Sequence, residues 1–390
     1  MRACLMAFPP WNWTIQSPYC IKETPGAISG NFCKYFVSLS LLSVPEFVSL
    51  FEFCGGFGAV ADGNNICLVI MKTYNRIFET HADALLARSQ QAKTDIAVSL
   101  EQAGALPLTV GAYQMRNACG GASVKKDNLE RMISAIHAAA QQHVQMLAFP
   151  EMCLPGYFTP LAGTAEEAAV ANRNLADVIP ESPYIQSLQK AARETNMVLA
   201  FGFSELADGT VYNSIGIIDA DGSWLGTRRK TPLYPWPYET GSFSEPGLDA
   251  RAVVFVTKYA TIGISNCFDG EFPESIRRMR LAGAEVLLWC NAACGNADIG
   301  TSHRINHSGS HAQANNLWVV CCNCVAKNAS GTSVIVSRTG EPLVILPPNE
   351  EALAVATINL TLTKTWEPWQ SRVDQHGYST RPTGPMRQHR

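Results

Sequence analysis

Short apolar runs alternate with helix-prone segments along most of this chain, and the alternation limits the folds open to it. Segment 127–144, for instance, repeats apolar residues about every 3.6 positions and lies between two apolar runs of strand length. The predicted strands are 108–114, 146–149, 197–203, 211–219, 224–229, 251–255, 261–265, 285–290, 317–324, 332–336 and 352–358, and the predicted helices are 127–144, 184–195 and 273–282. Such a mixture predicts an α/β fold in which helices cover packed sheets.

The same pattern sets the domain organisation. It extends from about residue 108 to about residue 362 of the 390, a length that fits one large domain. Residues 1–107 form an N-terminal extension, in which about 72–105 are rich in the helix formers Ala, Leu, Gln and Glu. Residues 363–390 form a polar C-terminal tail, which we expect to run over the surface.

Charge and cysteine usage exclude several classes of protein. The formal net charge is -3 and the basic residues are scattered, which argues against binding to nucleic acid or to anionic membranes. Several of the 13 cysteines lie inside apolar runs, where a free thiol behaves as a small buried hydrophobe. The spacing of zinc knuckles is missing. These features predict a reducing compartment, and we expect the cytoplasm.

One N-terminal stretch raises the question of a membrane anchor. Tyr35 to Phe51 is apolar, but Pro45 and Glu46 interrupt it, whereas a spanning helix needs about 20 mostly apolar residues. The first residues also lack the basic and apolar regions of a signal peptide. We therefore expect no membrane attachment, and a membrane-attached enzyme remains the alternative.

Three reactive side chains lie at the ends of predicted strands. Glu151 occurs in FPEMCLPGY, Lys230 in RRKTPLY and Cys267 in SNCFDGEFPE. Strand ends on a rigid scaffold can direct side chains into one pocket. A carboxylate, an ammonium and a thiol supply a base, an oxyanion stabiliser and a nucleophile for acyl transfer through a thioester. The competing interpretations are a buried structural thiol and a structural ion pair.

These motifs, in this order, resemble the nitrilase superfamily of carbon–nitrogen hydrolases. The resemblance covers about residues 108–362 and rests on MLAFPEMCLPGYF, RRKTPLYPWPYE, GISNCFDGEFPES and HAQANNLWVVCCN. It implies a four-layer α-β-β-α sandwich of the nitrilase type, often assembled as a homodimer or larger homo-oligomer. Asn266 and His311 depart from the pattern, since the family usually has an apolar residue and an Arg there. Neither residue is expected to touch the three reactive groups.

The chemistry of these groups assigns a role to each. Glu151 is expected to take the thiol proton of Cys267, and Lys230 with the backbone N–H of Phe268 to hold the oxyanion. The resemblance implies that Glu239 helps to position the substrate amide and Lys230. No cofactor is required.

Three further residues are candidates for the substrate pocket. Tyr157 follows the Glu151 motif, and Trp289 and Asn291 lie at or just after the end of a predicted strand. We predict that they form pocket walls, although most aromatic residues simply fill a core.

The residues after the nucleophile bear on the substrate. Cys267-Phe268-Asp269-Gly270 resembles the amidase branch of the superfamily. We therefore predict a hydrolase of linear, non-peptide amides that releases ammonia or an amine and a carboxylic acid. The alternatives are an N-carbamoyl amine or amino-acid amidohydrolase, then a nitrilase, and last a non-catalytic scaffold. In each enzymatic case the partner is a small molecule.

A series of three histidines raises the possibility of a metal site. His303, His307 and His311 are spaced four apart, so a helix would align them on one face. Gly309 between two serines argues against a regular helix there. Since the proposed chemistry needs no metal, we expect none.

Overall fold

The computed structural model describes residues 92–158, 163–247, 254–293, 297–326, 329–364 and 388–389. Expectations for residues 1–91, including the apolar stretch Tyr35 to Phe51, and for most of the C-terminal tail lie outside the described residues. Among the helices within those ranges, none is long and apolar enough to cross a membrane.

Two large sheets form the centre of the fold. The first has six strands in the order β14-β1-β2-β3-β4-β5, and the second has seven in the order β13-β12-β9-β8-β7-β6-β15. The first sheet comprises β1 (Pro107–Gln114), β2 (Met146–Ala148), β3 (Val198–Ala207), β4 (Thr210–Ile218), β5 (Trp224–Arg229) and β14 (Ala352–Asn359). The second comprises β6 (Val254–Val256), β7 (Thr261–Asn266), β8 (Val286–Asn291), β9 (Trp318–Asn323), β12 (Val334–Val336), β13 (Pro342–Ile345) and β15 (Gln388–His389).

Parallel strands lie at the centre of each sheet. In the first sheet β2 pairs in parallel with β1 and β3, and in the second β8 pairs in parallel with β7 and β9. A separate pair, β10 (Val325–Ala326) and β11 (Ala329–Ser330), is antiparallel. Parallel strands end together at one edge of their sheet, which is where the expected site residues follow β2 and β7.

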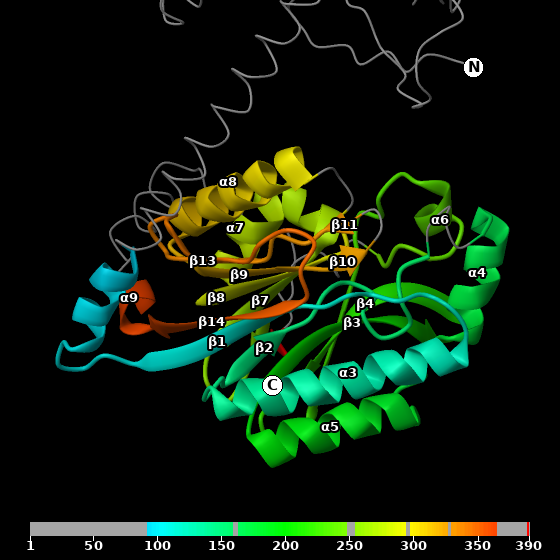
Figure 1. The fold of residues 1–390 in the computed structure, drawn as a ribbon, viewed down its shortest axis with the longest axis horizontal. Helices are drawn as coiled ribbons and strands as arrows, with labels where there is room; N and C mark the ends of the chain where they lie inside the picture. The colour runs from blue at the N-terminus through cyan, green and yellow to red at the C-terminus, as the bar shows by residue number, and fades with distance from the viewer. Residues whose placement is uncertain are drawn as a thin grey trace, which may run out of the picture. The chain divides into compact units, whose positions relative to one another are not determined.

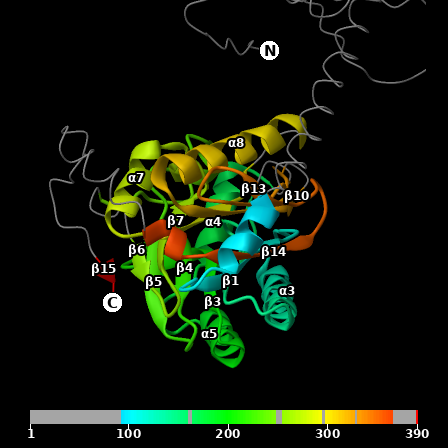
Figure 2. The same cartoon turned by 90° about the vertical axis from the view of Figure 1, so that its left-hand side faces the viewer.

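Helices cover the outer face of each sheet, as Figures 1 and 2 show for α3 and α5 on one side and α7 and α8 on the other. The helices are α3 (Ala122–Gln141), α4 (Ala165–Asn174), α5 (Pro183–Thr195), α6 (Pro237–Thr240), α7 (Pro273–Leu281), α8 (Ala297–Asn315) and α9 (Thr361–Lys364). The order helix, sheet, sheet, helix confirms the expected four-layer α-β-β-α sandwich.

The alternation of side chains along the central strands explains these layers. In β8, Leu288 and Cys290 pack into the core between the sheets, while Leu287 and Trp289 pack against α7 and α8. Successive side chains of a strand point to opposite faces, and here both faces are covered. This is why the run Val286 to Cys290 in β8 is apolar without interruption.

Most predicted elements agree with the structure to within a few residues, but α8 does not. The expectation that Gly309 breaks the helix is wrong, because α8 is continuous from Ala297 to Asn315. A Cβ on Gly309 would lie 2.8 Å from the carbonyl oxygen of Gly340, so the glycine permits close packing against that turn. Burial of Ile305 on the sheet therefore outweighs the low helix propensity of glycine.

The helix α4 was not predicted, although its start carries a sequence signal. Thr164 and Glu167 form a reciprocal capping box at its N-terminus. On the N-terminal side of β1, residues 92–100 are helical, and Ala92 and Ile96 pack into the core between the sheets. Part of the segment placed outside the domain by its sequence pattern thus contributes to the core.

Candidate active site

Glu151 lies in a turn just after β2 and is fully buried. Its backbone crosses β3 directly above Gly202, where a Cβ would lie 2.0 Å from the backbone nitrogen of Met152. No side chain fits in that space, so Gly202 allows the turn to approach the sheet. The backbone N–H of Glu151 donates to the carbonyl of Asn291 at 3.3 Å, which fastens this turn to the second sheet.

Lys230 follows β5 and lies between two carboxylates. Its Nζ is 2.7 Å from Glu151 Oε1 and 2.6 Å from Glu239 Oε1, and all three side chains are buried. Glu239 comes from the short helix α6. Burial opposes the charge of Lys230, but the two carboxylates outweigh it and hold the pKa of Lys230 above its ordinary value. Burial raises the pKa of Glu239, against the effect of Lys230.

Two donors that sequence reasoning missed complete the environment of Glu151. Asn213 Nδ2 donates to Glu151 Oε1 at 2.7 Å, and the backbone N–H of Ala292 donates to Oε2 at 3.0 Å. Asn213 could have been noticed as an amide within the apolar strand β4. The Ala292 N–H has no sequence signature, since any residue except proline supplies it.

Cys267 begins a short 3₁₀ helix, η2 (Cys267–Glu271), directly after β7. Its φ of 49° lies in the left-handed region, which non-glycine residues seldom adopt. The indole Nε1 of Trp289 donates to the Cys267 carbonyl at 2.8 Å. The neighbouring structure therefore holds Cys267 in an unfavourable backbone conformation.

A buried ion pair stabilises the turn that begins at Cys267. Arg228 Nη2 lies 2.9 Å from Asp269 Oδ2, and neither side chain is exposed to solvent. The other oxygen of Asp269 accepts from the hydroxyl of Ser265 and from the backbone N–H of Asn266, both at 2.6 Å. The aspartate of the motif after Cys267 thus orders the loop that carries the nucleophile.

Asn266 links the nucleophile turn to the Glu151 group. Its Nδ2 donates to Asn213 Oδ1 at 3.0 Å, and Asn213 in turn donates to Glu151. The side chain of Asn266 thus reaches Glu151 through Asn213. Its departure from the family pattern is explained by this polar bridge, which an apolar residue could not make.

The environment of Cys267 keeps its thiol neutral. Burial raises the pKa of Cys267 well above its ordinary value and Glu151 adds to the rise, while Lys230 and Arg304 act in the opposite direction. A thiol in this state reacts only when a base removes its proton. Glu151 is the buried carboxylate whose charge acts on it most strongly.

The four predicted pocket residues fall into two groups. Tyr157 and Phe268 are half-buried; the Tyr157 hydroxyl donates to Glu239 Oε2 at 2.7 Å, and the Phe268 ring meets Tyr234 edge to face at 5.1 Å. Trp289 and Asn291 are almost completely buried, and Asn291 Nδ2 donates to the Trp289 carbonyl at 2.9 Å. In the described structure their polar groups therefore bind the protein itself.

Arg304 on α8 is a cation that sequence reasoning did not single out. Its side chain is only 4% exposed, and its Nε has no hydrogen-bond partner within the described part of the chain. The charge of Arg304 nevertheless acts on Cys267. No motif in the sequence marks it.

The histidine series lies on α8, outside the Glu151–Lys230–Cys267 group. His303 and His307 contact Glu271, which sequence reasoning did not connect with them. His311 is buried instead, with its Nε2 2.8 Å from the carbonyl oxygen of Gly270, so that nitrogen donates.

Comparison with known proteins gives a consistent family. The sequence profile described as carbon–nitrogen hydrolase matches residues 109–368. The chain is 33% identical over 276 residues to an N-carbamoylputrescine amidase of Solanum lycopersicum, covering 66% of this chain and 88% of that protein. It is 31% identical over 246 residues to a citrullinase of Francisella tularensis, covering 60% of this chain and 84% of that protein.

Solved structures share the fold. Nit3 of Saccharomyces cerevisiae, described as a member of branch 10 of the nitrilase superfamily, superposes with a TM-score of 0.56 at 20% identity, covering 72% of this chain and 97% of that one. An amidase from Nesterenkonia sp. superposes with a TM-score of 0.53 at 21% identity, covering 70% and 97%. The chain belongs to the carbon–nitrogen hydrolase family, as its motifs predicted.

Proposed function

We propose that this protein is a cysteine-dependent amidohydrolase acting on a linear, non-peptide amide. The observation that carries the proposal is the buried group of Glu151, Lys230 and Glu239, with contacts of 2.7 and 2.6 Å, beside a strained turn that presents Cys267. Neither a structural thiol nor a structural ion pair accounts for all of these features together. The products are ammonia or an amine and a carboxylic acid.

Acylation starts with a proton transfer. Glu151 takes the proton of the Cys267 thiol, and the thiolate attacks the carbonyl carbon of the amide. Lys230 and the backbone N–H of Phe268 stabilise the oxyanion of the tetrahedral intermediate. Glu151 then returns the proton to the leaving nitrogen, so the carbon–nitrogen bond breaks and a thioester remains.

Deacylation reverses the roles. Glu151 removes a proton from water, whose oxygen attacks the thioester carbon, and the thiol of Cys267 leaves with the proton. Glu239 contributes by position. Its contact with Lys230 and its bond from Tyr157 hold the ammonium beside Glu151 through both halves of the cycle.

Arg304 favours one alternative substrate class, an N-carbamoyl amino acid. Arg304 Nε has no hydrogen-bond partner among the described residues, and a carboxylate is the best counter-ion for a buried guanidinium. A substrate with both a carbamoyl group and a carboxylate would place the first at Cys267 and the second at Arg304. The similarity to a citrullinase agrees with this, because citrulline is an amino acid with a carbamoyl-type group.

Ammonia release from a substrate panel tests these proposals. Purified wild type and Cys267→Ala are incubated with an aliphatic amide, an N-carbamoyl amine, an N-carbamoyl amino acid and a nitrile. Activity lost in Cys267→Ala supports the thiol mechanism, and equal activity in both proteins contradicts it. Hydrolysis of the nitrile alone overturns the amidase assignment. Inactivity of folded wild type towards the whole panel favours the scaffold interpretation.

Arg304→Gln separates the two carbamoyl substrates. We expect KM for the N-carbamoyl amino acid to rise at least about tenfold, since a charge-assisted bond contributes roughly 1.5–3 kcal/mol. KM for the N-carbamoyl amine should stay within about twofold, because that substrate has no carboxylate. Arg173→Gln, which changes an exposed arginine bonded to the Gly209 carbonyl, is the matched control. An equal rise for both substrates refutes the carboxylate contact.

The compartment and assembly belong to the same proposal. The cysteines that the structure describes outside its uncertain segments are free thiols, which suits a reducing cytoplasm. The family resemblance supports a homodimer or larger homo-oligomer. Light scattering of the purified protein at several concentrations measures the assembly directly, and a monomer at all of them contradicts it.

A further inference from the structure

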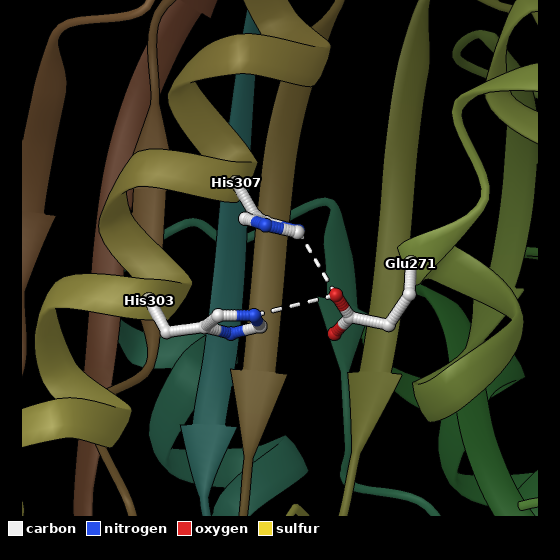
Figure 3. Close-up of side chains that lie close together, drawn as sticks. All are labelled: Glu271, His303 and His307. Atoms are coloured by element: carbon white, nitrogen blue, oxygen red, sulfur yellow. Dashed lines mark ion pairs between the residues drawn. The ribbon is translucent and has the colours of Figure 1, made fainter. Parts of the chain in front are cut away.

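Glu271, His303 and His307 form a cluster of potential metal ligands. Glu271 Oε2 lies 3.4 Å from His303 Nε2 and 3.0 Å from His307 Nδ1. Figure 3 shows both imidazoles extending from α8 towards the carboxylate, which lies at the end of η2. One ligand atom from each residue lies within 4.8 Å of the other two. Two segments far apart in sequence thus bring three donors together.

We propose that these three residues bind a divalent transition-metal ion of the zinc class. The proposal concerns a site that the hydrolytic mechanism does not use, and it holds whether or not the proposed hydrolysis is correct. The three residues would be the protein ligands, and the remaining coordination position would be filled by water or by a small anion.

The spacing of the ligand atoms suits such an ion. Tetrahedral zinc with bonds of about 2.0–2.1 Å places its ligand atoms about 3.3 Å apart. The two contacts of Glu271, at 3.4 and 3.0 Å, already lie close to that separation. The third distance, between the ligand nitrogens of His303 and His307, is at most 4.8 Å, and small rotations of the imidazoles would shorten it to the same separation. The ring centroids of His303 and His307 are 4.1 Å apart, so both rings already occupy one side of the helix.

The helix supplies the pairing of the two histidines. Residues four apart lie one above the other on a helix, and α8 is continuous through His303 and His307. Gly309 therefore does not interrupt the helix, contrary to the argument from the sequence. His311, one turn further along, is not a ligand, because its Nε2 is bonded to the Gly270 carbonyl.

The donor types indicate which ions bind. Two imidazoles and one carboxylate form a nitrogen–oxygen set that suits zinc, nickel, copper or cobalt better than calcium or magnesium. The three side chains are 42, 39 and 26% exposed for His303, His307 and Glu271, so an ion can enter from solvent. A surface pocket of about 420 Å³ is lined by Glu271 and His307 and provides room for the additional ligand.

Binding of an ion at this site would connect η2, which begins at Cys267, to α8. Glu271 is the last residue of η2, and Cys267 is the first. An ion held by Glu271 and the two histidines would therefore restrain the turn without contacting the reacting atoms. Its role would be positional, and we expect it to stabilise the folded protein.

Calorimetric titration of the full-length protein tests the proposal. The protein is treated with a chelator, dialysed, and titrated with zinc chloride and, separately, with cobalt chloride. We expect one saturable site in wild type. Loss of a direct ligand in His303→Asn or His307→Asn should weaken binding by more than the roughly 10- to 100-fold loss typical of outer-shell changes. His137→Asn, which removes an exposed histidine on α3, should bind as wild type does.

Two further measurements distinguish this site from the active site and from misfolding. Cys267→Ala should retain the site, and bound cobalt should show visible absorption without a thiolate charge-transfer band. Thermal melts without metal should agree between wild type and the histidine variants, while added zinc should raise the melting temperature of wild type alone. Unchanged affinity in a His303→Asn/His307→Asn double variant overturns the proposal. Loss of binding in Cys267→Ala also overturns it.

Discussion

The buried ion pair Arg228–Asp269 lies next to the turn that begins at Cys267, and breaking it is the most demanding test of this structure. Asp269→Asn preserves the size of the side chain and leaves an oxygen to accept from Ser265 and Asn266. It removes the charge that faces Arg228 at 2.9 Å in a region without solvent exposure. The buried guanidinium would then lose the negative charge that Asp269 supplies. We therefore expect a large loss of stability from a change of one atom type.

The magnitude follows from the geometry. At 2.9 Å and an effective dielectric constant of about 20, Coulomb's law gives roughly 6 kcal/mol for the pair before desolvation is considered. Removing one member of a buried pair costs about 3–5 kcal/mol. The exposed pair Lys126–Glu130, at 3.8 Å, supplies a matched control. Glu130→Gln should cost only about 0.3–0.5 kcal/mol.

Urea unfolding followed by circular dichroism measures both variants. We expect Asp269→Asn to lower the unfolding midpoint with little change in the m-value, and to lower kcat because the turn that carries Cys267 loosens. An Arg228→Met/Asp269→Leu double variant should recover part of the lost stability, since it leaves no unpaired charge. If Asp269→Asn and Glu130→Gln lose equal free energies of unfolding, the reasoning is refuted.

Three other perturbations probe the same site. Gly202→Ala should cost more than about 3 kcal/mol in urea unfolding, because its Cβ would meet the backbone after Glu151. Gly121→Ala has open space around it and should cost no more than about 1 kcal/mol, the loss expected for Ala at the N-cap of α3. Lys230→Met should lower kcat by about 10²–10³-fold in the ammonia assay, and an unchanged kcat would exclude an oxyanion role. Glu151→Gln should lower the pKa of Cys267, because it removes a nearby negative charge. Alkylation by iodoacetamide should then be faster at a given pH, and slower alkylation would mean that Glu151 deprotonates the resting thiol.

The fold could be predicted largely because its constraints are local. The run that forms β8 is apolar on both faces, and its neighbour β9 has the same character. A sandwich covered by helices requires strands that are buried on two faces, so the apolar pattern of these strands predicts the architecture. Local propensity failed at α8, where Gly309 packs against Gly340. The contact that decides this helix lies outside its own sequence.

Some residues of the site could likewise be predicted from local sequence, and others could not. Glu151, Lys230 and Cys267 were predicted because each follows an apolar run within a characteristic motif, and Glu239 because the family resemblance implies a positioning carboxylate in this region. The partners of these groups were missed, since pairs such as Asn213 with Glu151, or Glu271 with His307, form only when distant segments meet. Sequence spacing cannot reveal such pairs, whereas strand register and helix packing determine them.

The charges of the site explain why a second carboxylate accompanies the Glu151–Lys230 pair. With a neutral thiol, the two carboxylates of Glu151 and Glu239 balance the cations Lys230 and Arg304, all four being nearly inaccessible to solvent. The proposed transfer of a proton from Cys267 to Glu151 would move the negative charge within this group and leave its total unchanged, so no net charge would have to be created away from water. Without Glu239 the group would carry an excess positive charge. In the proposed mechanism that excess would oppose the transfer of a proton from Cys267 to Glu151.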